Sequence, residues 1–295
     1  MRYCTAALIG VGVVLAGFPV RAQDAAHKLA AQRKAAGDNW GMLEAGEAAS
    51  HETEHLLLMA PKTMERRLKE IGASLEKSYA LAVKAVQLKP KEELWQGKLT
   101  VYLLPERQQF TTFVRRIETR RLNEDESCTY AVASDVPHVS ASGPRAKSDL
   151  SLEFQAAVQV AAALMQKKAG AQVPLPAWLV AGFGRATVWR AAPTDKTVVS
   201  DRRLSRAGVV GKKRTPSDVW GESTLEGEEA SVVRASLAEF LAYGPGASKF
   251  TALLDGFKPG ENMDSRTIEQ ALESAKIDAK AIEARWGPWV AAGSK

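Results

Sequence analysis

The sequence of 295 residues has a formal net charge of +6, and 45% of its residues are hydrophobic. The basic and acidic side chains, 40 and 34 in number, are too evenly balanced and too scattered to indicate a nucleic-acid-binding protein. A chain of this length can bury enough apolar surface to form one large domain or two small ones.

Residues 1–22 have the three parts of a secretory signal peptide. Arg2 supplies a positive charge, residues 4–18 are apolar and uncharged, and Ala22 closes a cleavage site of small residues. The apolar stretch is shorter than the roughly 20 residues needed to span a bilayer, and an uncleaved anchor is the alternative. We therefore expect export to the periplasm or the exterior, and a soluble mature chain with no transmembrane segment.

Two features follow from removal of this signal. The net charge falls from +6 to +4, because two arginines and no acid are lost, and Cys128 remains as the only cysteine. The mature chain can therefore form no intrachain disulfide. Residues 23–50 are rich in Ala, Lys and Gln with little apolar patterning, which predicts a flexible N-terminal segment, with a frayed helix as one form of it.

Strands and helices alternate over residues 51–149, which we interpret as an α+β subdomain. Apolar runs at 54–60 and 98–104, and short β-rich runs at 128–134 and 138–142, predict four strands, the last two as a hairpin. A helix at 106–121 follows the second of these strands. Another amphipathic helix lies between the first two strands, because seven side chains recur there every three or four positions: Met64, Leu68, Ile71, Leu75, Tyr79, Ala82 and Val86.

Residues 150–295 predict a mainly helical subdomain. It contains a nearly uncharged helix at 150–168, a second helix at 177–190 and C-terminal helices within 228–291. The polar, basic stretch 193–219 is interpreted as a solvated loop, with an anionic partner as the alternative. Strands that precede helices are typical of the α+β class, here a small mixed sheet with N-terminal helices packed on a helical C-terminal half.

The segment from His51 to His55 reads HETEH and fits the zinc motif H-E-x-x-H. On a helix over 47–59, both histidines would share one face and hold zinc, with Glu52 as the general base of a metalloprotease. The segment also leads directly into the strand predicted at 54–60. Residues four apart on a strand are about 13 Å apart and cannot share one ion. We therefore keep an active zinc protease at this motif as the alternative function.

A second motif lies in residues 151–190, where Leu175 to Gly184 read LPAWLVAGFG. This run resembles the peptidase MA-like, gluzincin-type metallopeptidases, in which a buried helix carries H-E-x-x-H and the next helix opens L-P-x-W-L-x-E-G-x-A. Pro176, Trp178, Leu179 and Gly182 match that pattern. The resemblance covers about residues 54–290, is most specific at 175–184, and implies a gluzincin-like fold.

The residues that carry zinc chemistry in this family are replaced in this chain. The most economical register sets Gln155 and Gln159 at the two histidine positions and Ala156 at the general base. Ala181 stands at the third ligand, a glutamate in the family. A carboxamide is a poor zinc donor and alanine offers no donor atom, so the resemblance implies a degenerate site without metal or cofactor.

A register slipped to Ala157 and Ala161 restores no ligand either. The resemblance therefore implies a pseudo-metallopeptidase whose former substrate cleft binds a peptide, a glycan or an envelope protein. We expect the replaced positions to line that cleft together with Trp178, Gly182 and Arg185.

Overall fold

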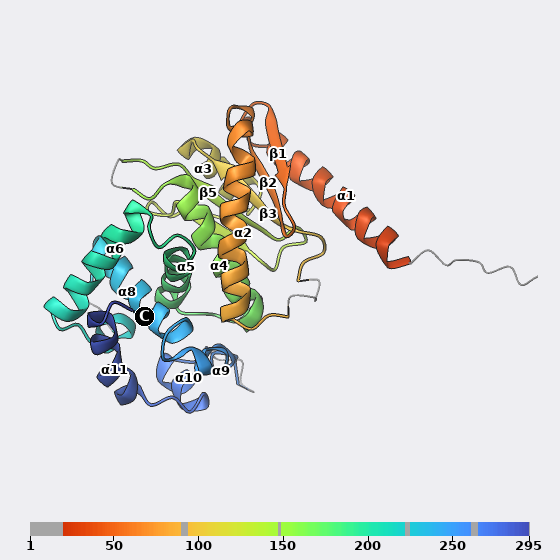
Figure 1. The fold of residues 1–295 in the computed structure, drawn as a ribbon. Coiled ribbons are helices and arrows are strands. Elements are labelled where there is room, and N and C mark those ends of the chain that lie inside the picture. Colours follow the sequence, from red (N-terminus) through yellow and green to blue (C-terminus); the bar gives the residue numbers. More distant parts are fainter. Residues whose placement is uncertain (1–19, 90–93, 147–148, 222–224, 261–264, 295) are drawn as a thin grey trace, which may run out of the picture.

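The computed structural model describes residues 20–89, 94–146, 149–221, 225–260 and 265–294 (Figure 1). The signal predicted at 1–22 lies almost entirely outside these ranges. The described chain has the α+β architecture predicted from the sequence, a five-stranded mixed sheet followed by a helical half.

The sheet has the strand order β1-β2-β3-β5-β4. Its three inner strands are parallel to one another, and both outer strands run antiparallel to their neighbours. The predicted hairpin is thus present as β4 and β5, at one edge of the sheet. The strands are β1 (Ala48–Glu52), β2 (Leu56–Pro61), β3 (Leu99–Leu104), β4 (Cys128–Ala131) and β5 (His138–Ser142).

Both faces of the central strands are covered. Leu56 and Leu58 of β2 belong to the main core, whereas Leu57 and Met59 point to a second, smaller core on the other face. This double burial explains why β2 and β3 are continuous apolar runs rather than alternating ones. Helices α2 (Leu68–Ala85) and α4 (Leu152–Ala169) pack on the first face, and α1 (Val20–Gly41) and α3 (Arg107–Arg116) on the second.

The predicted flexible segment at 23–50 is instead mostly helix α1 and the start of strand β1. Ala36 and Trp40 are buried in the smaller core, and the Trp40 indole donates to the Gly46 carbonyl at 3.0 Å. Gln32 is also buried and bonds to Thr100 at 2.9 Å. A helix was one of the forms predicted here, but the segment is not loosely held. Its attachment was hard to predict because so few apolar residues anchor α1 that its sequence shows little helical periodicity.

The helical half is built around α4, α5 (Ala177–Ala191) and α8 (Gly227–Ala242). Helix α5 lies between the other two and has a glycine toward each. A Cβ atom on Gly184 would come within 2.5 Å of the Val158 carbonyl oxygen of α4, and one on Gly182 within 2.7 Å of the Arg234 carbonyl oxygen of α8. These glycines therefore allow the three helices to pack closely.

The predicted basic loop at 193–219 is another correction, because it contains α6 (Lys196–Arg206), a π-helical turn and α7. The Asp195 side chain caps α6 by accepting from the Thr197 and Val198 amides, and Val198 is fully buried. A few inward positions thus fold a polar segment into a helix, which lies at the outer edge of the helical half (Figure 1).

Further helices complete the fold near the predicted positions. None of the helices in the described ranges is long and apolar enough to cross a membrane. The short elements after β2 and α6 are η1 (Lys62–Arg67), η2 (Ala207–Gly211) and α7 (Ser217–Trp220). The C-terminal ones are η3 (Ala247–Lys249), α9 (Phe250–Gly256), α10 (Ile268–Ser274) and α11 (Ala279–Ala291).

Candidate binding cleft

Strand β4 forms one edge of the described sheet and leaves part of its backbone unpaired by other strands. The Ser142 amide donates to the Ser127 carbonyl at 2.7 Å, so alternate residues from Ser127 onward bond to β5. The residues between them, Cys128 and Tyr130, direct their N–H and C=O groups away from β5. β4 is thus an open edge that could pair with another strand.

A row of glutamines on α4 faces this edge strand. Gln159 donates to the Cys128 sulfur at 2.9 Å, and Gln166 accepts from the Tyr130 hydroxyl at 3.0 Å. Gln155 lies one turn before Gln159 on the same face and bonds through its Nε2 atom to the Ser142 and Leu150 carbonyls. The row places carboxamides beside both outward-facing residues of β4.

A polar cleft of about 450 Å³ lies at the Cys128 end of this row. Gln155 and Arg185 line it, so two residues predicted for the cleft do meet there. The Oε1 atoms of Gln155 and Gln159 are buried and accept no hydrogen bond from the described residues. The full lining is Asp125, Ser127, Cys128, Gly143, Arg145, Asp149, Leu150, Gln155, Val158, Arg185, Glu228 and Ser231.

A second hollow of about 430 Å³ lies at the other end of β4. Tyr130 and Ala131 of the strand, Gln166 of α4 and the loop at 171–175 line it, together with residues 132–134. The edge strand therefore runs between two hollows, each of which has walls from β4 and α4. We call the polar cleft, β4 and this second hollow together the β4 groove.

Arg185 lines the cleft as expected, but it is a buried structural residue. Its guanidinium donates through two nitrogens to Asp201, both at 2.7 Å, and also pairs with Glu228 at the cleft wall. The Trp189 indole donates to the same Asp201 carboxylate at 2.8 Å. Because its donors are held by Asp201 and Glu228, Arg185 shapes the cleft without offering a free positive charge.

The other residues predicted for the cleft lie elsewhere. Ala156 is fully buried beneath it, and Trp178 packs against Trp220 in the core. Gly182 faces α8, and Ala181 is exposed and lines none of the cavities described here. Sequence reasoning missed Gln166, which the helical period could have identified, since it lies two turns beyond Gln159 on the same face.

Cys128 lies at the base of the β4 groove. Burial raises the pKa of its thiol to about 11, although the hydrogen bonds from Gln159 and Ser127 oppose that rise. The residue as a whole is only half-buried. The enclosed sulfur is therefore a protonated, weakly reactive thiol at neutral pH, as expected of a small buried residue.

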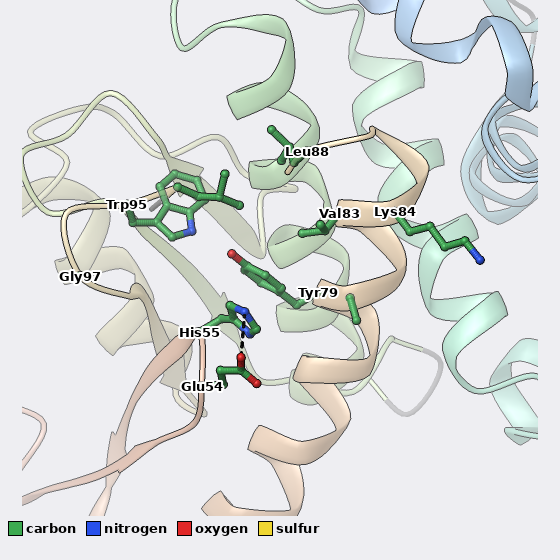
Figure 2. Close-up of a pocket in the computed structure, with 10 residues that line it drawn as sticks. Glu54, His55, Tyr79, Val83, Lys84, Leu88, Trp95 and Gly97 are labelled. Atoms are coloured by element: carbon green, nitrogen blue, oxygen red, sulfur yellow. Dashed lines mark ion pairs between the residues drawn. The ribbon is translucent and has the colours of Figure 1, made fainter. Parts of the chain in front are cut away.

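The HETEH segment forms a β-hairpin, so the helix that the zinc alternative requires over 47–59 is absent from these described residues. His51 lies in β1 opposite Leu58, and Glu52 pairs with Arg33 at 2.5 Å. His55 lies in the turn before β2 and bonds to Glu76 at 2.8 Å. Figure 2 shows its longer contact with Glu54, at 3.8 Å. Glu52 and His55 thus bond to different partners, and His51 lies in the strand that precedes His55.

Neither motif supplies a donor set that fits zinc. Gln155 already uses its amide nitrogen for two backbone carbonyls, and Ala181 has no donor atom. No cluster of three or more His, Cys, Asp or Glu side chains that could hold a metal ion occurs within the described part of the chain.

Comparison with known proteins assigns the chain to no group. No family model matches it, and no curated protein matches it either.

Proposed function

We propose that this chain is an exported, non-catalytic protein that binds an extended peptide along the β4 groove. The observation that carries the proposal is the open backbone edge at Cys128 and Tyr130, which lies between two hollows. An extended peptide that adds to a sheet edge gains main-chain hydrogen bonds, and flanking pockets receive its alternate side chains.

The glutamine row supports the same mode of binding. The Oε1 atoms of Gln155 and Gln159 are buried acceptors without a donor among the described residues, so a small shift of the cleft wall on binding would let peptide N–H groups donate to them. The cleft rim carries charges of both signs, from Arg145, Asp125 and Asp149. A peptide with a mixed sequence therefore complements the rim better than a uniformly charged polymer does.

The absence of catalysis in this proposal depends on the side chains at the former active-site positions. Gln155, Ala156 and Gln159 offer neither a general base nor a nucleophile beside the groove. The resemblance to gluzincins, together with an α+β fold whose edge strand faces the glutamine-bearing helix, supports an origin as a peptidase that has lost its reaction. The competing hypothesis is that the β4 groove binds a glycan or an envelope protein instead of a peptide.

The direct test screens a library of extended peptides against the chain from residue 23 and measures affinity by fluorescence polarisation. Cys128→Pro removes an outward N–H without removing a β5 hydrogen bond, and its ring blocks the edge. Cys128→Ala is the matched control, since it loses the same thiol but keeps the N–H.

We expect the proline variant to bind at least about tenfold more weakly than the alanine variant, with similar unfolding midpoints. Equal affinities of the two variants would show that the peptide does not use the edge. A chain that binds oligosaccharides but no peptide would refute the proposed ligand class.

The zinc alternative has its own measurement. The chain from residue 23, purified without chelator, is analysed for bound zinc by mass spectrometry beside a His55→Ala variant. We expect no stoichiometric zinc in either protein, because His51 and His55 do not converge. About one zinc per chain that is lost in the variant would establish HETEH as a metal site and overturn the proposal.

A further inference from the structure

A second cavity, also about 450 Å³ in volume, is lined by α2, by residues 94–97 and by the end of the HETEH segment, and it shares no lining residue with the β4 groove. Its walls are mostly apolar and include two large aromatic side chains, Tyr79 and Trp95 (Figure 2). We call it the aromatic pocket. It is lined by Glu54, His55, Tyr79, Ala80, Val83, Lys84, Leu88, Leu94, Trp95 and Gly97.

His55 is held in one orientation at the edge of this pocket. Its Nδ1 atom lies 2.8 Å from the Glu76 carboxylate, which also accepts from the His55 backbone N–H at 2.8 Å. The ring stacks on Tyr79 with centroids 4.4 Å apart. In the tautomer whose Nδ1–H donates to Glu76, the Nε2 atom is an acceptor. The nearest carboxylate to that atom, Glu54, is 3.8 Å away and makes no hydrogen bond with it.

Trp95 supplies an indole donor without a well-formed hydrogen bond at the wall of the same pocket. The residue is only 4% exposed, and its Nε1 atom has no hydrogen-bond partner of good geometry among the described residues. In Figure 2 this nitrogen points toward the Tyr79 hydroxyl. Burial raises the pKa of Tyr79 to about 12, although the indole N–H of Trp95 opposes that rise, so the phenol is neutral at physiological pH. A buried indole N–H without a partner costs free energy, and a ligand acceptor placed beside it removes that cost.

The described lining of the pocket directs no positive charge at an anion. Among these residues Lys84 is the only lysine or arginine, and it directs its ammonium group away from His55 and Tyr79 (Figure 2). Glu54 at the rim is exposed and disfavours anions further. The walls formed by Val83, Leu88 and Leu94 are apolar, so the chemistry selects a neutral, largely apolar ligand.

We propose that the aromatic pocket binds a small neutral phenol. Its ring would pack against Tyr79, Trp95 and Val83. Its hydroxyl would donate to His55 Nε2 and accept from Trp95 Nε1–H. A hydroxyl serves both groups at once, whereas a ketone satisfies only the donor and a hydrocarbon satisfies neither.

The test uses p-cresol as the probe and measures its affinity by calorimetry and by ligand-observed NMR, with toluene and 4-methylbenzoate as comparisons. We expect p-cresol to bind about three- to tenfold more tightly than toluene, since one hydrogen bond contributes about that factor, and we expect the benzoate to bind least. Equal affinity for p-cresol and toluene, or tighter binding of the benzoate, would overturn the assignment of a phenol.

Two variants locate the ligand. Trp95→Phe keeps the aromatic wall but removes the N–H, and should weaken p-cresol binding about three- to tenfold while it leaves toluene unchanged. Ala80 is exposed on α2 at the pocket wall, so Ala80→Trp should narrow the pocket and abolish binding without disturbing the core. Unchanged p-cresol binding in Ala80→Trp would show that the probe binds elsewhere and would refute the site.

Because Cys128→Pro leaves this pocket intact, that variant should bind p-cresol normally, which separates this proposal from the peptide proposal.

Discussion

The polar cleft beside β4 and the aromatic pocket beside α2 have the same volume, but their polar groups are used differently. In the cleft, the Arg185 charge is paired with Asp201 within the protein, and the groups without partners are the outward backbone of β4 and the buried amide oxygens of Gln155 and Gln159. In the pocket, the Trp95 indole N–H has no partner of good geometry among the described residues, and the walls are apolar. The first site therefore suits a polymer with a repeating backbone, and the second a compact molecule with one polar group.

Among the changes predicted here, loss of the buried ion pair between Arg185 and Asp201 should lower the free energy of unfolding most. Asp201→Ala would leave Arg185, which is 5% exposed, with only the exposed partner Glu228. We expect a loss of about 3–5 kcal/mol in the free energy of unfolding, measured by urea denaturation, because a buried charge loses its partner. The control Glu228→Gln should cost about 1 kcal/mol or less. A small loss in Asp201→Ala would mean that Arg185 is free to act as a ligand-binding charge.

The burial of Tyr79 in the aromatic pocket should make the stability of the protein fall at alkaline pH. The pKa of Tyr79 is raised from an ordinary value near 10 to about 12, so the unfolded chain loses this proton first. The stabilisation from neutral Tyr79 is complete below pH 10 and is lost as the pH rises through 12. The unfolding free energy should fall more steeply in the wild type than in Tyr79→Phe, by up to about 1.4 kcal/mol for each pH unit. Parallel curves between pH 10 and 12 would show that the phenol is solvated.

In the polar cleft, the burial of the Cys128 thiol should likewise be measurable, as a slow reaction that depends on pH. With its pKa raised by burial from an ordinary value near 9 to about 11, the thiol should react with iodoacetamide about a hundredfold more slowly at pH 8 than in the urea-unfolded chain. Mass spectrometry of the chain from residue 23, which has no other cysteine, measures this rate directly. The rate should rise about tenfold per pH unit up to pH 11. Labelling of the folded chain at the unfolded rate would contradict an enclosed sulfur.

Local sequence patterns predicted the central elements well. Helices α4 and α5 and strands β3 and β5 begin and end within about two residues of their predicted bounds. These elements are long apolar stretches or β-rich runs, and the burial on both faces of β3 leaves a clear signal. Strand β1 was missed because Ala48 to Glu52 have little β propensity and form a strand only by pairing with β2.

The functional groupings were harder to predict, because they depend on contacts between distant segments. The letters of HETEH match a zinc motif, yet His55 bonds to Glu76 and Glu52 to Arg33, and no local pattern indicates these partners. Gln155 and Gln159 could be placed together because they lie one helical turn apart. Their position beside Cys128 depends on the packing of α4 against the edge strand, which the sequence alone does not determine.

The smallest effect expected concerns the contact that joins α4 to the edge strand. Tyr130→Phe removes the hydroxyl that donates to Gln166 Oε1 at 3.0 Å and leaves that nearly buried amide oxygen without this donor. We expect a loss of about 1 kcal/mol in unfolding free energy, the usual cost of one such hydrogen bond. Because the outward N–H and C=O of residue 130 remain, peptide affinity should change less than in Cys128→Pro, and p-cresol affinity should not change. A larger loss of peptide binding in Tyr130→Phe than in Cys128→Pro would show that the tyrosine hydroxyl, rather than the strand backbone, is the main contact in the β4 groove.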